Sequence, residues 1–307
     1  MPNISPQELK SRISSGLMCF PLTDFDAAGN LAAHACARRF EWLASFDTSA
    51  FVVAGGAGEF FSLSAQEYVE LIATAVRVVG PRFPVIAGVG YGTRMAIALA
   101  QEAEQLGADG LLLMPPYLTE GSQAGLVAHI GAVCAATRLG VVVYNRANCR
   151  LNADSVAQLA RLCPNLIGFK DGVGDLEQLV AIRTAAADRL AFFNGMPTAE
   201  TFAPAFKGIG IPVYSSAIFN FVPRTALRFH KALNAGDDTT VAQITQQLLV
   251  PYVKIRGRQP GYAVSIVKAG ARIVGRDAGP VRPPLSDLTR AEYDELAALI
   301  AKLGPQS

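Results

Sequence analysis

The chain has 307 residues, of which 51% are hydrophobic and 17% are charged, and its formal net charge at neutral pH is +2. This length and composition predict a globular protein with an ample core, and the balanced charge gives no reason to expect nucleic acid or a membrane surface as a partner. No uninterrupted apolar run reaches the roughly 20 residues that a membrane span needs.

The N-terminal segment and the cysteines indicate the compartment. Residues Met1–Gly16 are polar and carry prolines in place of an apolar signal core, so we expect no export. The five cysteines are odd in number and form no C-x-x-C pair, which favours reduced thiols in the cytoplasm.

Short β-branched runs alternate with helical segments along most of the chain. Eight runs predict strands, at Leu17–Phe20, Ser49–Ala54, Pro84–Gly88, Gly110–Met114, Gly140–Tyr144, Leu166–Lys170, Leu190–Asn194 and Ile209–Tyr214. Helical spacing is found between them, at Ser64–Val79, Arg94–Leu106, Ser122–Thr137, Asp154–Leu162 and Leu176–Ala186. About eight βα units are typical of a parallel barrel, whereas a doubly wound sheet usually has fewer. We therefore predict an α/β fold of the (β/α)8 TIM barrel type.

Beyond Pro223 the strand pattern stops. Four segments predict helices, at Arg224–Asn234, Thr239–Tyr252, Gly261–Val274 and Thr289–Leu303. No linker-like stretch separates them from the preceding part. We predict a barrel catalytic domain over residues 1–223 and a C-terminal helical extension over residues 224–307 that packs on it.

The residues at the C-terminal ends of barrel strands are the candidates for catalysis. Lys170 ends an apolar run, where apolar neighbours lower the pKa of an ammonium group and make a nucleophilic amine available near neutral pH. The alternatives are a lysine that extends to solvent or one that pairs with Asp171. Tyr144 ends the preceding strand and is expected beside Lys170, although a tyrosine at a barrel rim is more commonly a core residue.

Other motifs are less specific. The run Gly55–Glu59 is compatible with a simple tight turn, but its backbone N–H groups could also hold a carboxylate. It lacks the Gly-Lys-Ser/Thr ending of a phosphate loop. The three histidines fall in helical segments without an Asp, Glu or Cys cluster, so we expect neither a metal site nor a serine-type triad.

Several of these motifs, taken in order, resemble the dihydrodipicolinate synthase / N-acetylneuraminate lyase family. They are G-G-A-G-E at Gly55–Glu59, P-P-Y at Pro115–Tyr117, Y-N at Tyr144–Asn145, G-F-K-D at Gly168–Asp171 and the segment Asn220–Pro223. The resemblance runs from about Gly16 to the C-terminal helices. It implies that Lys170 forms the Schiff base and that Tyr144 is the acid/base. It also implies that the Gly56 and Ala57 N–H groups bind the carboxylate of a 2-oxo acid, and that Tyr117 reaches across a dimer interface.

The chain departs from the family pattern at two places. Thr or Ser usually stands at the positions of Gly56 and Ala57, so the hydroxyl that links two tyrosines is missing, and we expect water or Ser215 to replace it. The arginine that grips the distal carboxylate in the synthases is matched by Cys149, which leaves Arg146 and Arg150 nearby as substitutes.

Within the family, G-G-x-G-E-F-F-S-L and Y-S-S-A-I-F-N-F-V-P resemble the glucarate branch. This resemblance implies a decarboxylating hydro-lyase that acts on a small 2-oxo dicarboxylate without a metal or an organic cofactor. It also implies a homo-oligomer arranged as a dimer of dimers. Two alternatives remain open: a class I aldolase, lyase or synthase acting on another 2-oxo acid, and a catalytically silent ligand-binding barrel.

Overall fold

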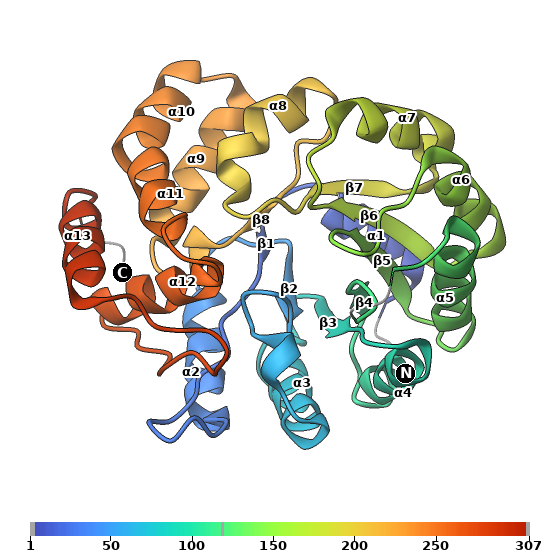
Figure 1. The fold of residues 1–307 in the computed structure, drawn as a ribbon, viewed down its shortest axis with the longest axis horizontal. Coiled ribbons are helices and arrows are strands. Elements are labelled where there is room, and N and C mark those ends of the chain that lie inside the picture. The colour runs from blue at the N-terminus through green and yellow to red at the C-terminus, as the bar shows by residue number, and fades with distance from the viewer. Residues whose placement is uncertain (1–3, 118–119, 305–307) are drawn as a thin grey trace.

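A ring of eight parallel strands forms the centre of the molecule in the computed structural model, which describes residues 4–117 and 120–304 (Figure 1). The strands are β1 (Met18–Cys19), β2 (Ala50–Val53), β3 (Val85–Val89), β4 (Gly110–Leu113), β5 (Gly140–Asn145), β6 (Leu166–Asp171), β7 (Ala191–Asn194) and β8 (Ser215–Ser216). Their hydrogen-bonded order is β7-β6-β5-β4-β3-β2-β1-β8. Asn194 donates its N–H to Val213 O at 2.9 Å, which brings β7 beside the chain just before β8. The predicted TIM barrel is therefore confirmed.

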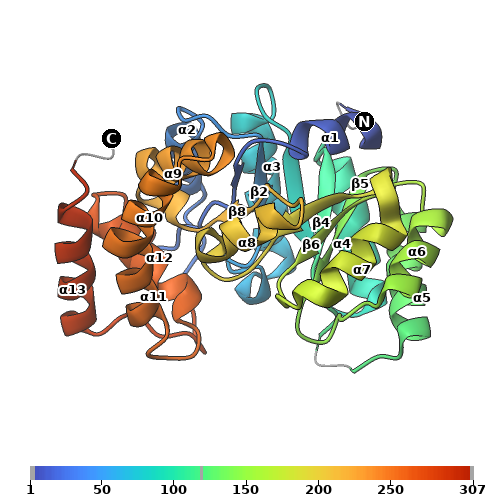
Figure 2. The same ribbon diagram turned by 90° about the horizontal axis from the view of Figure 1, so that it is seen from above.

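Helices surround this barrel on its outside (Figures 1 and 2). They are α2 (Ala33–Leu43), α3 (Ala65–Val79), α4 (Thr93–Gln105), α5 (Gln123–Ala135), α6 (Ala153–Leu162), α7 (Leu176–Ala186) and α8 (Ala203–Gly208). A further helix, α1 (Pro6–Ile13), was not predicted. Its buried Leu9 lies against Gly110 and Gly140, the first residues of β4 and β5. Helix α1 thus covers the N-terminal end of the barrel and leaves the C-terminal end for a site.

Both faces of the barrel sheet are buried, so its strands are mostly apolar and their side chains point alternately into two separate clusters. In β2, Ala50 and Val52 belong to the apolar cluster inside the barrel, whereas Phe51 and Val53 belong to the larger cluster beneath the helices. Consecutive side chains of a strand point to opposite faces of the sheet. At the C-terminal strand ends, the side chains that point inward therefore converge on one mouth.

The predicted eighth strand is wrong in its position. Ile209 ends α8 instead of starting a strand, because its N–H donates to Ala205 O and Phe206 O in the last helical turn. Gly210 follows with φ +82°, a left-handed conformation that reverses the chain. The strand β8 begins only at Ser215, and a short apolar run of this kind fits a helix end as well as a strand.

The C-terminal helices are α9 (Pro223–Ala235), α10 (Asp238–Ile244), α11 (Val250–Arg256), α12 (Tyr262–Ile273) and α13 (Arg290–Ala301), and they pack beside the barrel (Figure 1). The single helix predicted over Thr239–Tyr252 is instead α10, a π-helical turn at Thr245–Leu249, and α11. Pro251 explains the turn, since proline has no N–H for the regular helical bond and its ring crowds the preceding turn. In the described residues no helix combines the length and apolarity needed to cross a membrane.

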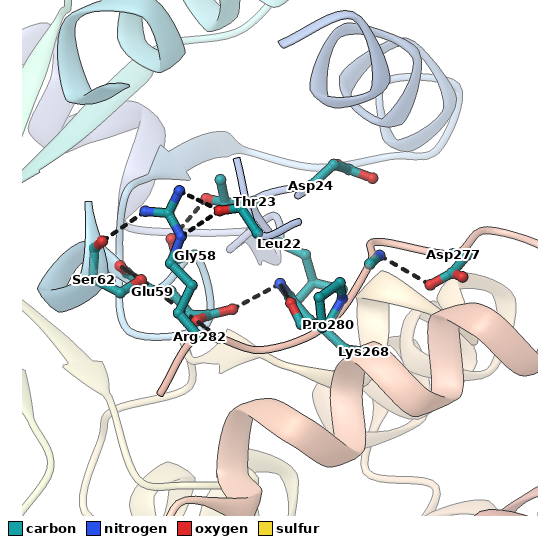
Figure 3. Close-up of polar contacts among 12 residues, drawn as sticks. Leu22, Thr23, Asp24, Gly58, Glu59, Ser62, Lys268, Asp277, Pro280 and Arg282 are labelled. Carbon is teal, nitrogen blue, oxygen red and sulfur yellow. Dashed lines mark hydrogen bonds and ion pairs between the residues drawn. The ribbon is translucent and has the colours of Figure 1, made fainter. Parts of the chain in front are cut away.

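Buried polar contacts join this extension to the barrel (Figure 3). Lys268 of α12 forms an ion pair with Glu59 at 2.7 Å, and both side chains are fully buried. Arg282 forms an ion pair with Glu67 on α3 and donates through its backbone N–H to Glu59 at 3.1 Å. These contacts fix the loop after β2 from the side of the C-terminal helices.

Candidate active site

A strand irregularity determines the direction in which Lys170 points. Between β5 and β6 the pairing shifts by one residue, because Val141 lies opposite Leu166 but Val142 lies opposite Gly168. The extra residue makes a bulge, after which the side chains of β6 alternate in the opposite phase. Lys170 therefore points into the barrel mouth and not toward the surrounding helices.

The Lys170 side chain is almost completely enclosed, with an exposed fraction of 5%. Its Nζ lies 4.1 Å from the ring centroid of Phe20 and 4.3 Å from that of Tyr144. Burial, together with the positive charge on Arg146, lowers the pKa of the Lys170 amine to about 7. A substantial fraction of this amine is therefore neutral, and nucleophilic, near neutral pH.

Tyr144 lies directly opposite Lys170 in the sheet register. Its hydroxyl donates to Gly195 O at 2.7 Å and accepts from Arg146 Nη1 at 2.9 Å. Burial raises the pKa of the Tyr144 hydroxyl, and the Arg146 guanidinium acts in the opposite direction. The hydroxyl is thus protonated at neutral pH and is held by two partners.

Two glycines make this close packing possible. A Cβ atom at Gly195 would stand 2.6 Å from Lys170 Cε and 2.9 Å from Tyr144 Cε2. A Cβ atom at Gly172 would stand 2.8 Å from Tyr144 Cε2. Any side chain at either position would push the lysine and the tyrosine out of their present places.

Asp171 is not a partner of Lys170, so the ion-pair alternative is wrong. Its Oδ1 accepts from Asn145 Nδ2 at 2.8 Å, and its Oδ2 accepts from Gly174 N at 2.9 Å. Asn145 in turn accepts from Leu151 N at 2.9 Å. This buried network ties together the ends of β5 and β6, on which the tyrosine and the lysine stand.

The loop after β2 offers free backbone donors. Neither the Gly56 N–H nor the Ala57 N–H has an acceptor in the part of the chain that the structure describes. Ala57 packs against the cluster inside the barrel, and the space around the Gly56 α-carbon is open. Thr23 Oγ1 donates to Gly58 O at 2.6 Å and Glu59 is held by Lys268, so the loop is fixed on both sides of its donors (Figure 3).

The remaining predicted residues lie at different distances from this centre. Arg146 donates a hydrogen bond to Tyr144, whereas Ser215 Oγ lies 3.5 Å from Asn194 O and forms a hydrogen bond with neither Tyr144 nor Lys170. Tyr117 is 64% exposed, and its ring packs at 6.3 Å on that of Tyr91. The Cys149 side chain is buried in the cluster beneath the helices, where burial raises its thiol pKa to about 12.

Sequence reasoning assigned no role to three residues at or near this centre. Phe20 and Gly195 follow their strands in the chain, but nothing in the sequence singles them out from other strand-end residues. Arg256, at the end of α11, donates from Nη1 to Pro197 O at 2.8 Å and to Thr198 Oγ1 at 2.6 Å. In the described residues no group of three or more His, Cys, Asp or Glu side chains is placed to hold a metal ion.

Fold and site together define the class of the protein: a (β/α)8 TIM barrel with an enclosed, partly neutral lysine at its mouth. The model of the dihydrodipicolinate synthetase family matches residues 13–303, so the chain belongs to this family. A solved relative is the dihydrodipicolinate synthase DapA-2 from Bacillus anthracis, which is 28% identical with a TM-score of 0.85 over 94% of this chain and 99% of that chain.

Relatives with higher identity cover essentially the whole chain. A Pseudomonas putida protein named 5-dehydro-4-deoxyglucarate dehydratase is 57% identical over 99% of this chain and 100% of its own length. An Azotobacter vinelandii protein named probable 5-dehydro-4-deoxyglucarate dehydratase is also 57% identical, with the same coverage. The fold and the family expected from the sequence motifs are thereby confirmed.

Proposed function

We propose that this chain is a 5-dehydro-4-deoxyglucarate dehydratase that works through a Schiff base on Lys170. The observation that carries the proposal is the enclosed Lys170 amine, with a pKa of about 7, packed against the Tyr144 ring. The names of the full-length relatives supply the substrate, since Lys170 alone does not distinguish one small 2-oxo acid from another.

The reaction starts when the neutral Lys170 amine attacks the 2-oxo carbon of the substrate. Loss of water gives a protonated imine, which withdraws electrons from the neighbouring carbon. We assign the proton transfers in this step to Tyr144, because its ring packs on the amine and its hydroxyl is a proton donor on the same side chain. The Gly56 and Ala57 N–H groups bind the carboxylate adjacent to the oxo group, in the manner of other backbone anion sites.

The later steps use the imine as the electron sink. Removal of a proton from the carbon next to the imine gives an enamine, which expels the β-hydroxyl as water. The conjugated imine that results accepts the electron pair of the bond to the distal carboxylate, which leaves as carbon dioxide. Tautomerisation and hydrolysis then release 2,5-dioxopentanoate and the free lysine. Atoms balance as substrate giving 2,5-dioxopentanoate, carbon dioxide and water.

Borohydride reduction tests the covalent step. Incubation with substrate or pyruvate and borohydride should leave a stable adduct on the peptide that contains Lys170, and Lys170→Arg should lose this adduct and nearly all turnover. The exposed Lys254 provides the matched control, since Lys254→Arg should retain both. An adduct on a different lysine would refute the assignment, and no adduct at all would favour the silent barrel.

Product analysis separates the dehydratase from the aldolase alternative. The dehydratase releases one carbon dioxide for each substrate consumed and no pyruvate. An aldolase of the same family would cleave a carbon–carbon bond and release pyruvate from the imine. Substrate consumption with stoichiometric pyruvate would therefore assign the chain to the aldolase type.

A further inference from the structure

Two arginines from distant parts of the chain are linked to one short loop at the barrel mouth, one directly and one through a tyrosine. The loop, residues 195–198, follows β7 and begins at Gly195, which packs on Lys170. Arg256 donates to the loop directly, at Pro197 O and Thr198 Oγ1. Arg146 reaches it through Tyr144, whose hydroxyl accepts from Arg146 and donates to Gly195 O.

Both guanidinium groups lack a negative partner. In the described part of the chain neither Arg146 nor Arg256 forms an ion pair, although nine other ion pairs are present. Burial lowers the pKa of the half-buried Arg256, and Arg146 contributes to the lowering as a like charge, while Tyr252 opposes it. Arg146 acts as a like charge on both Lys170 and Arg256, so an anion bound between the two guanidinium groups would be attracted by both.

The positions around the barrel indicate which anion this is. The free N–H groups of Gly56 and Ala57 follow β2, whereas Arg146 follows β5 and the loop at residues 195–198 follows β7. In the order of the sheet, β3, β4 and β5 separate β2 from β6, so the two strands lie on opposite sides of the barrel. Lys170 on β6 and the arginines beside β5 and β7 therefore lie across the mouth from the loop after β2. A linear 2-oxo acid bound at the β2 loop and at Lys170 directs its far end toward the arginines.

We propose that Arg256 determines specificity for a 2-oxo dicarboxylate by binding its distal carboxylate together with Arg146. This inference rests on the proposed function, since it assumes that the 2-oxo group reacts with Lys170. Arg256 Nη1 is already used by the loop, so the carboxylate is left with the Nε and Nη2 donors. Arg256 thus takes no part in imine formation. It binds the carboxylate that later leaves as carbon dioxide, and its role is to select and position that end of the substrate.

The test compares two 2-oxo acids of the same chain length that can form the imine but have no hydroxyl group to lose as water. 2-Oxoadipate has the distal carboxylate, and 2-oxohexanoate has a methyl group in its place. The concentration of each acid that gives half-maximal borohydride trapping on Lys170 is measured in wild type, Arg256→Gln and Arg256→Lys. Gln retains an N–H donor for the loop but has no charge. Arg258→Gln is the matched control, because Arg258 is an arginine nearby that pairs with Glu295 at the surface.

We expect wild type and Arg258→Gln to prefer 2-oxoadipate. Arg256→Gln should weaken 2-oxoadipate trapping by about 10- to 100-fold, as for the loss of a charged hydrogen bond, and leave 2-oxohexanoate unchanged. Arg256→Lys should recover part of the preference. With the natural substrate, Arg256→Gln should raise KM more than it lowers kcat, the sign of lost ground-state binding.

The possible failures are distinguishable. Equal weakening for both acids in Arg256→Gln would show that the residue only supports the loop, and an unchanged preference would show that another group binds the distal carboxylate. Either result would overturn this inference and leave the proposed function intact. Failure of wild type to trap either acid on Lys170 would overturn both.

Discussion

The carboxylate of Glu59 and the ammonium group of Lys268 meet at 2.7 Å, and both side chains are fully buried. Glu59 ends the loop that carries Gly56 and Ala57 and has φ +53°, a strained value for a residue with a side chain. Lys268 comes from the middle of α12 and also donates to Pro280 O at 2.8 Å. The C-terminal helices thereby hold the proposed carboxylate-binding loop in place.

Breaking this pair should destabilise the protein and weaken substrate binding. Glu59→Gln leaves the Lys268 charge buried without its partner, and we expect the free energy of unfolding to fall by about 3–5 kcal/mol. The pair Glu59→Gln with Lys268→Met should recover much of that loss, because neither charge remains. Denaturant unfolding measures both effects, and pyruvate trapping should require more pyruvate in the single variant.

A surface ion pair provides the control for this experiment. Arg290 and Asp294 lie 3.0 Å apart with side chains that are 85% and 54% exposed. Arg290→Ala should therefore change the free energy of unfolding by about 1 kcal/mol or less. Equal losses in Arg290→Ala and Glu59→Gln would contradict the role given to the buried pair.

Tyr144→Phe should slow the reaction without unfolding the protein. General acid–base catalysis contributes typically about 10²- to 10⁴-fold, so we expect kcat to fall within that range. The variant leaves Gly195 O and Arg146 Nη1 without their partner, which costs about 1–3 kcal/mol of stability. Steady-state kinetics and thermal unfolding measure the two effects.

Tyr68 is a suitable control for the loss of a buried hydroxyl. It lies on α3, is buried, and its hydroxyl has no hydrogen-bond partner in the described structure. Tyr68→Phe should leave kcat unchanged. If Tyr144→Phe also stayed within about threefold of wild type, proton transfer would belong to another group.

The sequence could predict the pairing of Lys170 with Tyr144, since both end adjacent apolar strands and parallel strands present their C-terminal ends together. It could not predict the bulge that turns Lys170 into the mouth, because a one-residue shift in pairing leaves no trace in the composition. Lys268 lies in an apolar run, as Lys170 does, but helical spacing does not tell which barrel residue a helix faces. The sequence could not predict the role of Arg256 either, because the residues it contacts lie far away in the chain.

Tyr117 leads us to propose a homo-oligomer built from dimers. Its exposed ring packs on Tyr91, and two further exposed apolar side chains, Met95 and Phe61, occur on neighbouring segments. A cluster of exposed apolar groups of this kind is typical of an interaction surface. We expect light scattering to give a dimer or a dimer of dimers. Met95→Glu should shift this state toward monomers, and a fully active wild-type monomer would contradict the proposal.

The pH dependence of the reaction should follow the Lys170 amine. Only the neutral amine attacks the substrate, so kcat/KM should rise with pH and level off above the Lys170 pKa of about 7. Arg146 contributes to lowering this pKa, and Arg146→Ala should therefore move the rise to higher pH. Arg161→Ala, a change on the exposed side of α6, should leave the profile in place. Identical profiles for all three proteins would exclude this role for Arg146.

The buried Lys170 amine should also make the stability of the fold depend on pH. Its pKa is about 7 in the folded protein, against an ordinary value of 10.5, so between these values the unfolded chain binds more protons than the folded one. The free energy of unfolding must then increase with pH across this window, and below about pH 7 the lysine has its full destabilising effect.

Lys170→Met removes this effect and replaces a costly buried cation by an apolar side chain of similar length. We expect the variant to be more stable than wild type at pH 7 by about 1–4 kcal/mol, the range found when buried ionic groups are replaced by apolar ones. The difference should shrink as the pH approaches 10.5, where wild type no longer has to give up a proton on folding. Unfolding curves at several pH values measure it, with the exposed Lys254→Met as control. A variant that is less stable than wild type at neutral pH would mean that the amine is well solvated, and the chemical role proposed for it would lose its physical basis.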